Sequence, residues 1–352
     1  MSTVKLSILD RANTRVHDGA TVSARQIFAE VTRRAKAAEQ LGYHRFWVAE
    51  HHSVPGIAGS APTLLIPHLA AATSRIRLGT GGIMVPSHQP LVIAEHIGTL
   101  QALVGPRFDA GLGASVAFTK PVRNALRQPD DAKDHFGQDV DNLIAYLDGT
   151  ADITAYPQDA SQTQLFVLTG GGSAKFAAQR GMGLVLGGPA VTNGLKPAPE
   201  SNTAVATYRE HFTAAEPRQQ RPYIIASVNI AVAKSRQAAE DLVLSEAWAL
   251  TRSRSIGVFQ PLEAPASIRA AKPSAQQQRR IDRLLATTIY GTQDDVVEQI
   301  HRVLAYTQAD EVMVTGNIWD PTSQQESDRL LIDAWRAVNG SSASCSTKAN
   351  QS

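Results

Sequence analysis

Apolar and polar positions divide the chain into short apolar runs that alternate with longer segments of helical period. Short apolar runs are typical of buried strands, and the longer segments are typical of amphipathic helices. Strands are expected at residues 4–9, 46–48, 76–85, 108–112, 165–168, 183–186, 223–232 and 311–314. Helices are expected at residues 23–41, 61–73, 90–103, 135–147, 173–180, 204–212, 235–251, 276–286, 294–306 and 323–338. The alternation predicts βα units around a parallel sheet.

Eight such strands favour a (β/α)8 TIM barrel of the α/β class. An open, doubly wound sheet is the alternative, because periodicity does not report whether a sheet closes. No Gly-x-Gly-x-x-Gly follows the first strand, which counts against that alternative. We expect one domain over residues 1–339. Residues 340–352 have the Gly- and Ser-rich composition of a disordered tail.

Three stretches lack a clear period and are expected to be loops: residues 115–134, 151–164 and 253–274. Long loops in compact domains are often lids over a site, although they can be simple insertions. The first stretch follows the fourth strand, so a lid over the catalytic face is one interpretation and an insertion the other. For the third stretch we favour a plain insertion or disorder.

Composition limits the classes of partner. The chain has 352 residues, 43% of them hydrophobic, with 34 Lys and Arg against 32 Asp and Glu, a net charge of +2. This net charge creates no strong positive electrostatic field that would favour binding to nucleic acid or to an anionic membrane. A small-molecule substrate is therefore expected. The one cysteine, Cys345, lies in the expected tail, which argues against disulfides and a cysteine nucleophile. No long apolar segment is present, and a soluble, cytoplasmic protein is expected.

The segment from Arg45 to His52 carries the main chemical signal. Four apolar residues, 46–49, lead directly into Glu50, His51 and His52. Reactive side chains of α/β barrels lie at the carboxyl ends of the strands, where the chain leaves the packed sheet. A histidine can exchange protons at neutral pH, and a neighbouring carboxylate can orient it. A polar loop or helix cap without catalytic function is the alternative.

Two glycine-rich segments are the next signals. Gly170, Gly171, Gly172 and Ser173 join a strand to a helix, so main-chain N–H groups converge there and could bind a phosphate. A tight turn with Ser173 as N-cap is the alternative. Thr292 is expected to cap the helix that follows residues 289–291.

Three glycines, at positions 79, 81 and 82, interrupt the strand at residues 76–85. Glycine within a strand usually marks a bulge or a group that presses against the backbone, such as a flat aromatic ring. Distortion of the strand without any ligand is the alternative.

Together these residues resemble the bacterial-luciferase-like superfamily of flavin-dependent monooxygenases. The similarity extends in order over about residues 4–338 and is most specific in residues 41–52, 74–82, 105–113 and 170–173. The chain is most similar to single-chain enzymes of bacterial secondary metabolism, including those that tailor polyketide antibiotics. The resemblance therefore implies that reduced FMN and O₂ oxygenate a small organic substrate, such as an aromatic polyketide.

The resemblance also implies places for the coenzyme. The isoalloxazine ring would lie over Gly81 and Gly82, where relatives have a cis peptide bond between non-proline residues. The phosphate would lie at Gly170–Ser173, and Gly113 would border the flavin. His51 would be the catalytic histidine and Glu50 its orienting carboxylate, whereas His52 would be structural.

One residue departs from the superfamily pattern. Relatives commonly have an arginine after the position of Gly113, where this chain has Ala114, Ser115 and Val116. Lys120, Arg123 or Arg127 could replace that charge, or the affinity for the flavin could be low.

Partners and rival functions follow from the same resemblance. A separate NAD(P)H-dependent reductase would supply FMNH₂, and a homodimer would form through the helices at residues 61–73 and 90–103. Hydride transfer with the deazaflavin F420 and a non-catalytic flavin-binding relative are the alternatives. A metal site is not expected, because adjacent His51 and His52 point apart on a strand.

Overall fold

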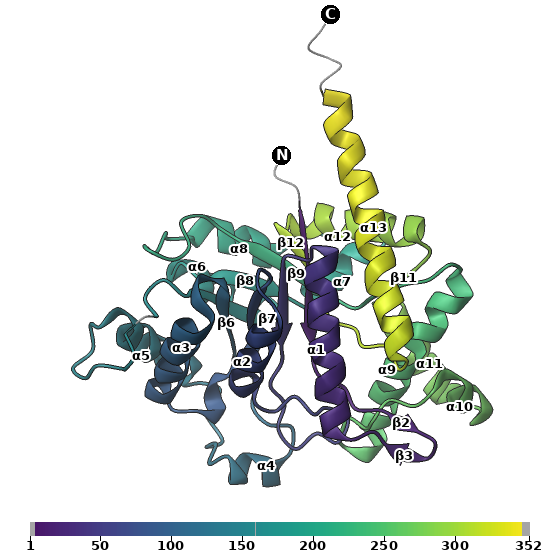
Figure 1. Ribbon diagram of the computed structural model, residues 1–352, viewed down its shortest axis with the longest axis horizontal. Coiled ribbons are helices and arrows are strands. Elements are labelled where there is room, and N and C mark those ends of the chain that lie inside the picture. The colour runs from purple at the N-terminus through teal and green to yellow at the C-terminus, as the bar shows by residue number, and fades with distance from the viewer. Residues whose placement is uncertain (1–3, 159, 347–352) are drawn as a thin grey trace, which may run out of the picture.

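The computed structural model describes residues 4–158 and 160–346, with side-chain surroundings through Ala337. Eight parallel strands form a closed barrel in the order β1-β12-β9-β8-β7-β6-β5-β4, and helices surround it (Figure 1). The predicted (β/α)8 barrel is confirmed and the open sheet is wrong. The barrel strands are β1 (Lys5–Asp10), β4 (Arg45–Val48), β5 (Arg77–Met84), β6 (Phe108–Gly113), β7 (Gln164–Thr169), β8 (Gly183–Leu186), β9 (Ile224–Val228) and β12 (Glu311–Val314).

Helices lie at most of the predicted positions, and several begin at the expected caps. The Ser23 and Ser235 side chains accept N–H groups of the first turns of α1 and α9, and Thr292 forms a capping box with Asp295 as expected. The helices are α1 (Ala24–Leu41), α2 (Pro62–Ala72), α3 (Pro90–Val104), α4 (Lys120–Ala125), α5 (Phe136–Asp148), α6 (Ala174–Gln179), α7 (Pro189–Thr192), α8 (Thr203–His211), α9 (Arg236–Ile256), α10 (Pro265–Ala270), α11 (Ala275–Leu285), α12 (Gln293–Thr307) and α13 (Pro321–Ser346).

Trp47 of β4 fills the interior of the barrel. Its side chain is fully buried, and its ring meets that of Phe166 edge to face, with centroids 5.1 Å apart. A Cβ atom at Gly79 would lie 2.4 Å from the indole nitrogen, so glycine there makes room for the indole. A Cβ atom at Gly111 would lie 2.2 Å from the Thr80 carbonyl oxygen and 3.2 Å from the indole, so the neighbouring strand is the closer obstacle at that position.

A buried charge cluster closes the other end of the barrel. Arg45, at the start of β4, donates to Glu311 at 2.8 Å and to Asp109 at 2.7 Å, and all three side chains are buried. Each charge there has an opposite partner, as burial of charge requires. The cluster links the first residues of β4 and β12 with β6, and it lies at the end remote from the strands' carboxyl termini.

Some boundaries differ from the prediction. The strand expected at residues 223–232 is divided into β9 and β10 (Ile230–Val232), and β10 pairs in parallel with the unpredicted β11 (Ile289–Gly291). A run of three residues is too short for periodicity to identify. A small hairpin, β2 (Val16–His17) with β3 (Ala20–Thr21), was also missed.

The expected loops and tail contain additional helix. α4 lies within residues 115–134, and α9 and α10 occupy much of residues 253–274. α13 continues to Ser346, into the stretch from residue 340 that was expected to be disordered, and residues 347–352 lie outside the described part of the chain. Extension of a docked helix needs no new nucleation, which lets a Ser-rich sequence remain helical. The end of α13 projects beyond the barrel (Figure 1).

Candidate active site

The chain after β4 leaves the barrel at Ala49 and carries the three candidate side chains in different directions. The Ala49 N–H donates to the Asp10 carbonyl at 3.1 Å, which is the last contact with β1, and the His51 N–H donates to the Gly59 carbonyl at 2.9 Å. Pairing with β1 therefore ends at Ala49. Successive side chains of a strand point to opposite faces, but this rule no longer applies to Glu50 and His51.

Glu50 is bound to His52 and His88 rather than to His51. Its Oε1 accepts from Nε2 of His52 and from Nε2 of His88, both at 2.7 Å, and its Oε2 accepts the Met84 N–H at 3.0 Å. The expected orientation of His51 by Glu50 is thus wrong, because the carboxylate bonds to His52, His88 and Met84 and the Nδ1 of His51 has no partner among the described residues. Burial alone would raise the pKa of Glu50, but the two histidine hydrogen bonds lower it to about 2.

The same cluster has the residue types of a metal site. One ligand atom from each of Glu50, His52 and His88 lies within 4.8 Å of the others. Sequence reasoning considered only the adjacent pair His51 and His52 and missed His88, which lies 36 positions after His52 in the chain. The order of strands in a barrel could have suggested it, since the segments after β4 and β5 are neighbours.

His51 instead borders a cavity of about 900 Å³. Its Nδ1 is buried without a hydrogen-bond partner among the described residues, and its ring stacks on that of Phe118, with centroids 6.3 Å apart and planes 12° apart. Burial, and next the charge of Arg11, lower the pKa of His51 to about 4. The imidazole is therefore neutral at pH 7 and can accept a proton.

Two of the expected loops cover this cavity. Phe118, from residues 115–134, is 68% exposed and lies over His51. Residues 253–274, which we expected to be a plain insertion, line the cavity through Gly257, Val258 and Phe259. The Gly56 N–H donates to the Phe259 carbonyl at 3.0 Å, which ties that loop to the segment after β4.

The glycine-rich centre of β5 is irregular, as predicted. The Gly81–Gly82 peptide bond is cis, and the pairing of β5 with β6 shifts register between Thr80 and Ile83. A Cβ atom at Gly81 would lie 2.4 Å from Cδ1 of Leu9, and one at Gly82 would lie 2.9 Å from the Gly111 carbonyl oxygen. Packing inside the barrel therefore already explains part of the glycine pattern, and the flat ring that presses on β5 at Gly79 is that of Trp47.

The turn at Gly170–Ser173 partly satisfies its own N–H groups. Oγ1 of Thr169 accepts the N–H groups of Gly171 and Ser173 at 3.1 and 3.2 Å, and the Ser173 side chain forms no capping bond. Ser173 is thus the N-cap residue of α6 by position, but its hydroxyl does not cap the N–H groups of the first helical turn. A Cβ atom at Gly170 or Gly172 would have no neighbour within 4 Å, so the backbone there is open to a ligand.

This turn fits a weakly held phosphate. The hydrogen bonds of the described residues use neither the Gly172 N–H nor the Ser173 hydroxyl, which leaves these two donors for an anion. No arginine or lysine belongs to the turn. Arg123, one of the expected substitutes for the missing arginine, donates to the Ala117 carbonyl of its own loop at 3.0 Å.

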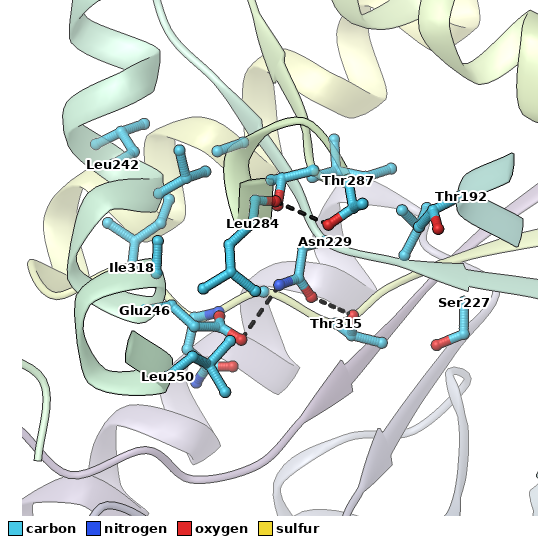
Figure 2. Close-up of a pocket in the computed structure, with 18 of the residues that line it drawn as sticks. Thr192, Ser227, Asn229, Leu242, Glu246, Leu250, Leu284, Thr287, Thr315 and Ile318 are labelled. Carbon is cyan, nitrogen blue, oxygen red and sulfur yellow. Dashed lines mark hydrogen bonds between the residues drawn. The ribbon is translucent and has the colours of Figure 1, made fainter. Parts of the chain in front are cut away.

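A second cavity, of about 280 Å³, opens at the ends of β8, β9 and β12. Figure 2 shows Asn229 at its centre, where it donates to Glu246 at 3.2 Å and accepts from Thr315 at 2.6 Å. Glu246 also binds Arg11 at 2.6 Å. Since Leu250 and Leu284 line both cavities, this polar network lies directly behind the wall of the His51 cavity.

Comparison with known proteins gives a consistent result. The family model for luciferase-like monooxygenases matches residues 5–311. A "luciferase-like monooxygenase" of Escherichia coli (strain K12) is 33% identical over 343 residues, which cover 96% of this chain and 99% of the relative. The crystal structure of apo-MsnO8 is 30% identical and superposes with a TM-score of 0.81, covering 95% of this chain and 98% of that one.

Two more distant structures share the fold and contain coenzymes. The FMN complex of the oxygenating component of 3,6-diketocamphane monooxygenase, from Pseudomonas putida, has a TM-score of 0.68 at 16% identity, with 94% and 97% of the two chains covered. An F420-dependent secondary alcohol dehydrogenase has a TM-score of 0.68 at 14% identity, with 95% and 98% covered. At these identities the similarity shows the fold alone.

Proposed function

The chain belongs to the family of luciferase-like monooxygenases, and from this premise we propose that it uses reduced FMN and O₂ to oxygenate a small organic substrate. The main observation that supports the proposal is the position of His51. Its neutral imidazole stands at the carboxyl end of a barrel strand, borders a cavity of about 900 Å³ and has an unpartnered Nδ1. A buried nitrogen without a partner is costly unless a ligand uses it.

Specific segments would hold the coenzyme. The Gly172 N–H and the Ser173 hydroxyl would bind the phosphate, and the irregular β5 backbone at Gly81 and Gly82 would support the isoalloxazine ring, with Gly113 beside it at the end of β6. When bound, the reduced flavin would activate O₂ for transfer of one oxygen atom to the substrate.

The residues around the cavity would control protons and water. His51, with its pKa lowered to about 4, would accept a proton from the reacting substrate and return it during release of water. Phe118 and Phe259 would cover the cavity and limit the entry of solvent, which would otherwise compete with the reaction. Glu50 would act as a positioning residue that fixes the end of β5 through the Met84 N–H.

The test is an oxygenation assay. The protein is incubated with FMN, a flavin reductase, NADH, O₂ and a panel of polycyclic aromatic compounds, and each mixture is analysed for a gain of one oxygen atom by mass. We expect a product with the protein and at least about 100-fold slower formation of it with the His51→Ala variant. A parallel reaction with reduced F420 in place of FMNH₂ tests the rival function, because turnover with F420 alone would replace the oxygenase proposal by hydride transfer.

Low affinity for oxidised flavin is a further part of the proposal. The phosphate turn contains no cation, and the arginine expected after Gly113 is absent. An enzyme that takes reduced flavin from a separate reductase needs to bind FMNH₂ more tightly than FMN. An anaerobic titration with both forms checks this expectation, and equal, tight affinities would contradict it.

The proposed partners are a flavin reductase and a second copy of the chain. α2 and α3 expose Leu64 by 77% and Val92 by 39%, which supports the proposed dimer face beside β4 and β5. The aromatic side chains of Phe118 and Phe259 at the cavity support a planar, apolar substrate such as a polyketide. Among the described residues, no helix combines the length and the apolar content that crossing a membrane requires.

A further inference from the structure

The His51 cavity has an unusual charge distribution. Four arginines line it, Arg11, Arg254, Arg280 and Arg283, and no aspartate or glutamate belongs to its described lining. The chain as a whole has nearly equal numbers of cationic and anionic residues, 34 and 32. The absence of carboxylates from this wall is therefore a local property of the cavity rather than a consequence of the overall charge.

Three of these four guanidinium groups are uncompensated. Arg11 forms a salt bridge of 2.6 Å with the buried Glu246. Arg254, Arg280 and Arg283 form no salt bridge with any described residue, and the Nε of Arg283 donates only to the Arg279 carbonyl, at 3.2 Å. These three positive charges, of which those of Arg254 and Arg283 are on exposed side chains, thus line one cavity without an anionic partner among the described residues.

The three arginines converge from two packed helices. Arg254 is in the last turn of α9, whereas Arg280 and Arg283 are three positions apart on α11, so they share one face of that helix. His51 reaches the same cavity from the segment that follows β4, and not from α9 or α11.

Most of the other side chains in the lining are apolar. Seven are aliphatic or aromatic, and Thr251 and Ser253 add two hydroxyl groups; the seven are Val54, Ile57, Phe118, Leu250, Val258, Phe259 and Leu284. A ligand that contacts the apolar side chains and also pairs with the arginines therefore needs an apolar body and an anionic group at one end.

We propose that the cavity binds a substrate with a carboxylate, which Arg254, Arg280 and Arg283 hold while the apolar body extends toward His51. Arginine suits this task because its planar guanidinium donates two parallel hydrogen bonds to a carboxylate. The inference deepens the proposed function, since it names the substrate class of the same site. The binding step itself does not depend on any reaction.

Calorimetric titration of the flavin-free protein with 2-naphthoate and with its neutral isostere 2-naphthamide tests this proposal. We expect the carboxylate to bind at least about tenfold more tightly than the amide. The double variant Arg280→Gln/Arg283→Gln should lose that preference. Arg279→Gln is the matched control, because Arg279 is an exposed arginine of the same helix that does not line the cavity.

Three results would overturn the proposal: equal affinity for the acid and the amide, an unchanged preference in the double variant, or the same loss in Arg279→Gln. A second source of anion is the phosphate of the coenzyme. If the double variant weakened the binding of FMN but not of riboflavin, these arginines would hold that phosphate, and the substrate assignment would be wrong.

The outcome is distinguishable from failure of the proposed function. Selective binding of 2-naphthoate that depends on Arg280 and Arg283 would establish the site even if no compound were oxygenated. In that case the proposed carboxylate subsite would be confirmed and the proposed monooxygenase reaction would be wrong. Oxygenation of neutral aromatic compounds alone, with no preference for acids, would support the reaction and contradict the subsite.

Discussion

The carboxylate of Glu50 accepts the main-chain N–H of Met84 at 3.0 Å and so joins the end of β4 to the end of β5. These strands carry His51 and the Gly81–Gly82 peptide. Because His52 and His88 hold the same carboxylate, the position of β5 relative to His51 depends on one buried, charged side chain. Glu50 therefore contacts the backbone of β5 rather than the imidazole of His51.

Glu50→Ala should lower the free energy of unfolding by about 3 kcal/mol, because it leaves two imidazoles and one N–H without their acceptor. Glu50→Gln should lower it less, since the amide oxygen can still accept. Urea denaturation measures both, with Glu326→Ala at an exposed ion pair as the control. A loss in Glu50→Ala no larger than that of the control would contradict this account.

The pH dependence of the same interaction has a definite sign. The pKa of Glu50 is about 2 in the folded protein, below the ordinary value of 4.5. Its contribution to stability is therefore complete above pH 4.5 and is lost as the pH falls toward 2. Unfolding curves of wild type and Glu50→Gln should accordingly converge over this range.

The barrel was predictable from the sequence because it depends on local pattern. Alternating apolar runs identified all eight barrel strands, and the end of one apolar run led to His51, which borders a cavity in the structure. The partners of Glu50 were not predictable in this way. They depend on how the segments after two neighbouring strands turn, and His88 lies 38 positions beyond Glu50 in the chain.

The turn after β7 also has hydrogen bonds that the sequence did not reveal. Ser173 is the N-cap residue of α6, yet its side chain forms no capping bond, whereas Oγ1 of Thr169 accepts the Gly171 and Ser173 N–H groups. Which hydroxyl forms such bonds depends on the conformation of the turn, with Gly171 at φ +117°. Glycine spacing alone does not contain this information.

His51 should act as a base over a broad pH range. Its pKa, lowered to about 4 by burial and by Arg11, keeps the imidazole neutral above about pH 5. The acid limb of kcat/KM should therefore lie near pH 4 instead of near 6.5, and His51→Ala should lower kcat/KM by about 10² to 10⁴-fold. The exposed His135→Ala is the control. An acid limb near pH 6.5 that disappears in His51→Ala would show that the imidazole is not desolvated.

Gly172→Ala should separate the affinity for the coenzyme from stability. A Cβ atom there meets nothing within 4 Å in the protein, so the melting temperature should not change. The methyl group would, however, occupy the space from which a phosphate reaches the Gly172 N–H, and we expect FMN to bind about tenfold more weakly. Riboflavin, which has no phosphate, should bind equally to wild type and variant. An equal loss for both ligands would place the phosphate elsewhere.

Leu64→Asp tests the proposed dimer. Leu64 on α2 is 77% exposed, so the monomer should tolerate the charge, whereas an apolar interface should not. Light scattering after size exclusion should show a dimer for wild type and a monomer for the variant. Ile153→Asp, at an exposed apolar residue outside α2 and α3, is the control. A wild-type monomer, or a dimer that persists in Leu64→Asp, would contradict this interface.

Gly81→Ala should destabilise the barrel by about 1–3 kcal/mol, because the new methyl group would lie 2.4 Å from Cδ1 of Leu9. Leu9→Ala removes that atom, so the double variant should be more stable than the sum of the single losses by at least about 0.5 kcal/mol. Gly79→Ala is a contrasting case, since its methyl group would also lie 2.6 Å from the carbonyl oxygen of Asp109, which no side-chain truncation removes. Leu9→Ala should therefore rescue Gly81→Ala and leave Gly79→Ala unchanged. Additive losses in both pairs would mean that the barrel relaxes around Gly81 without the help of Leu9.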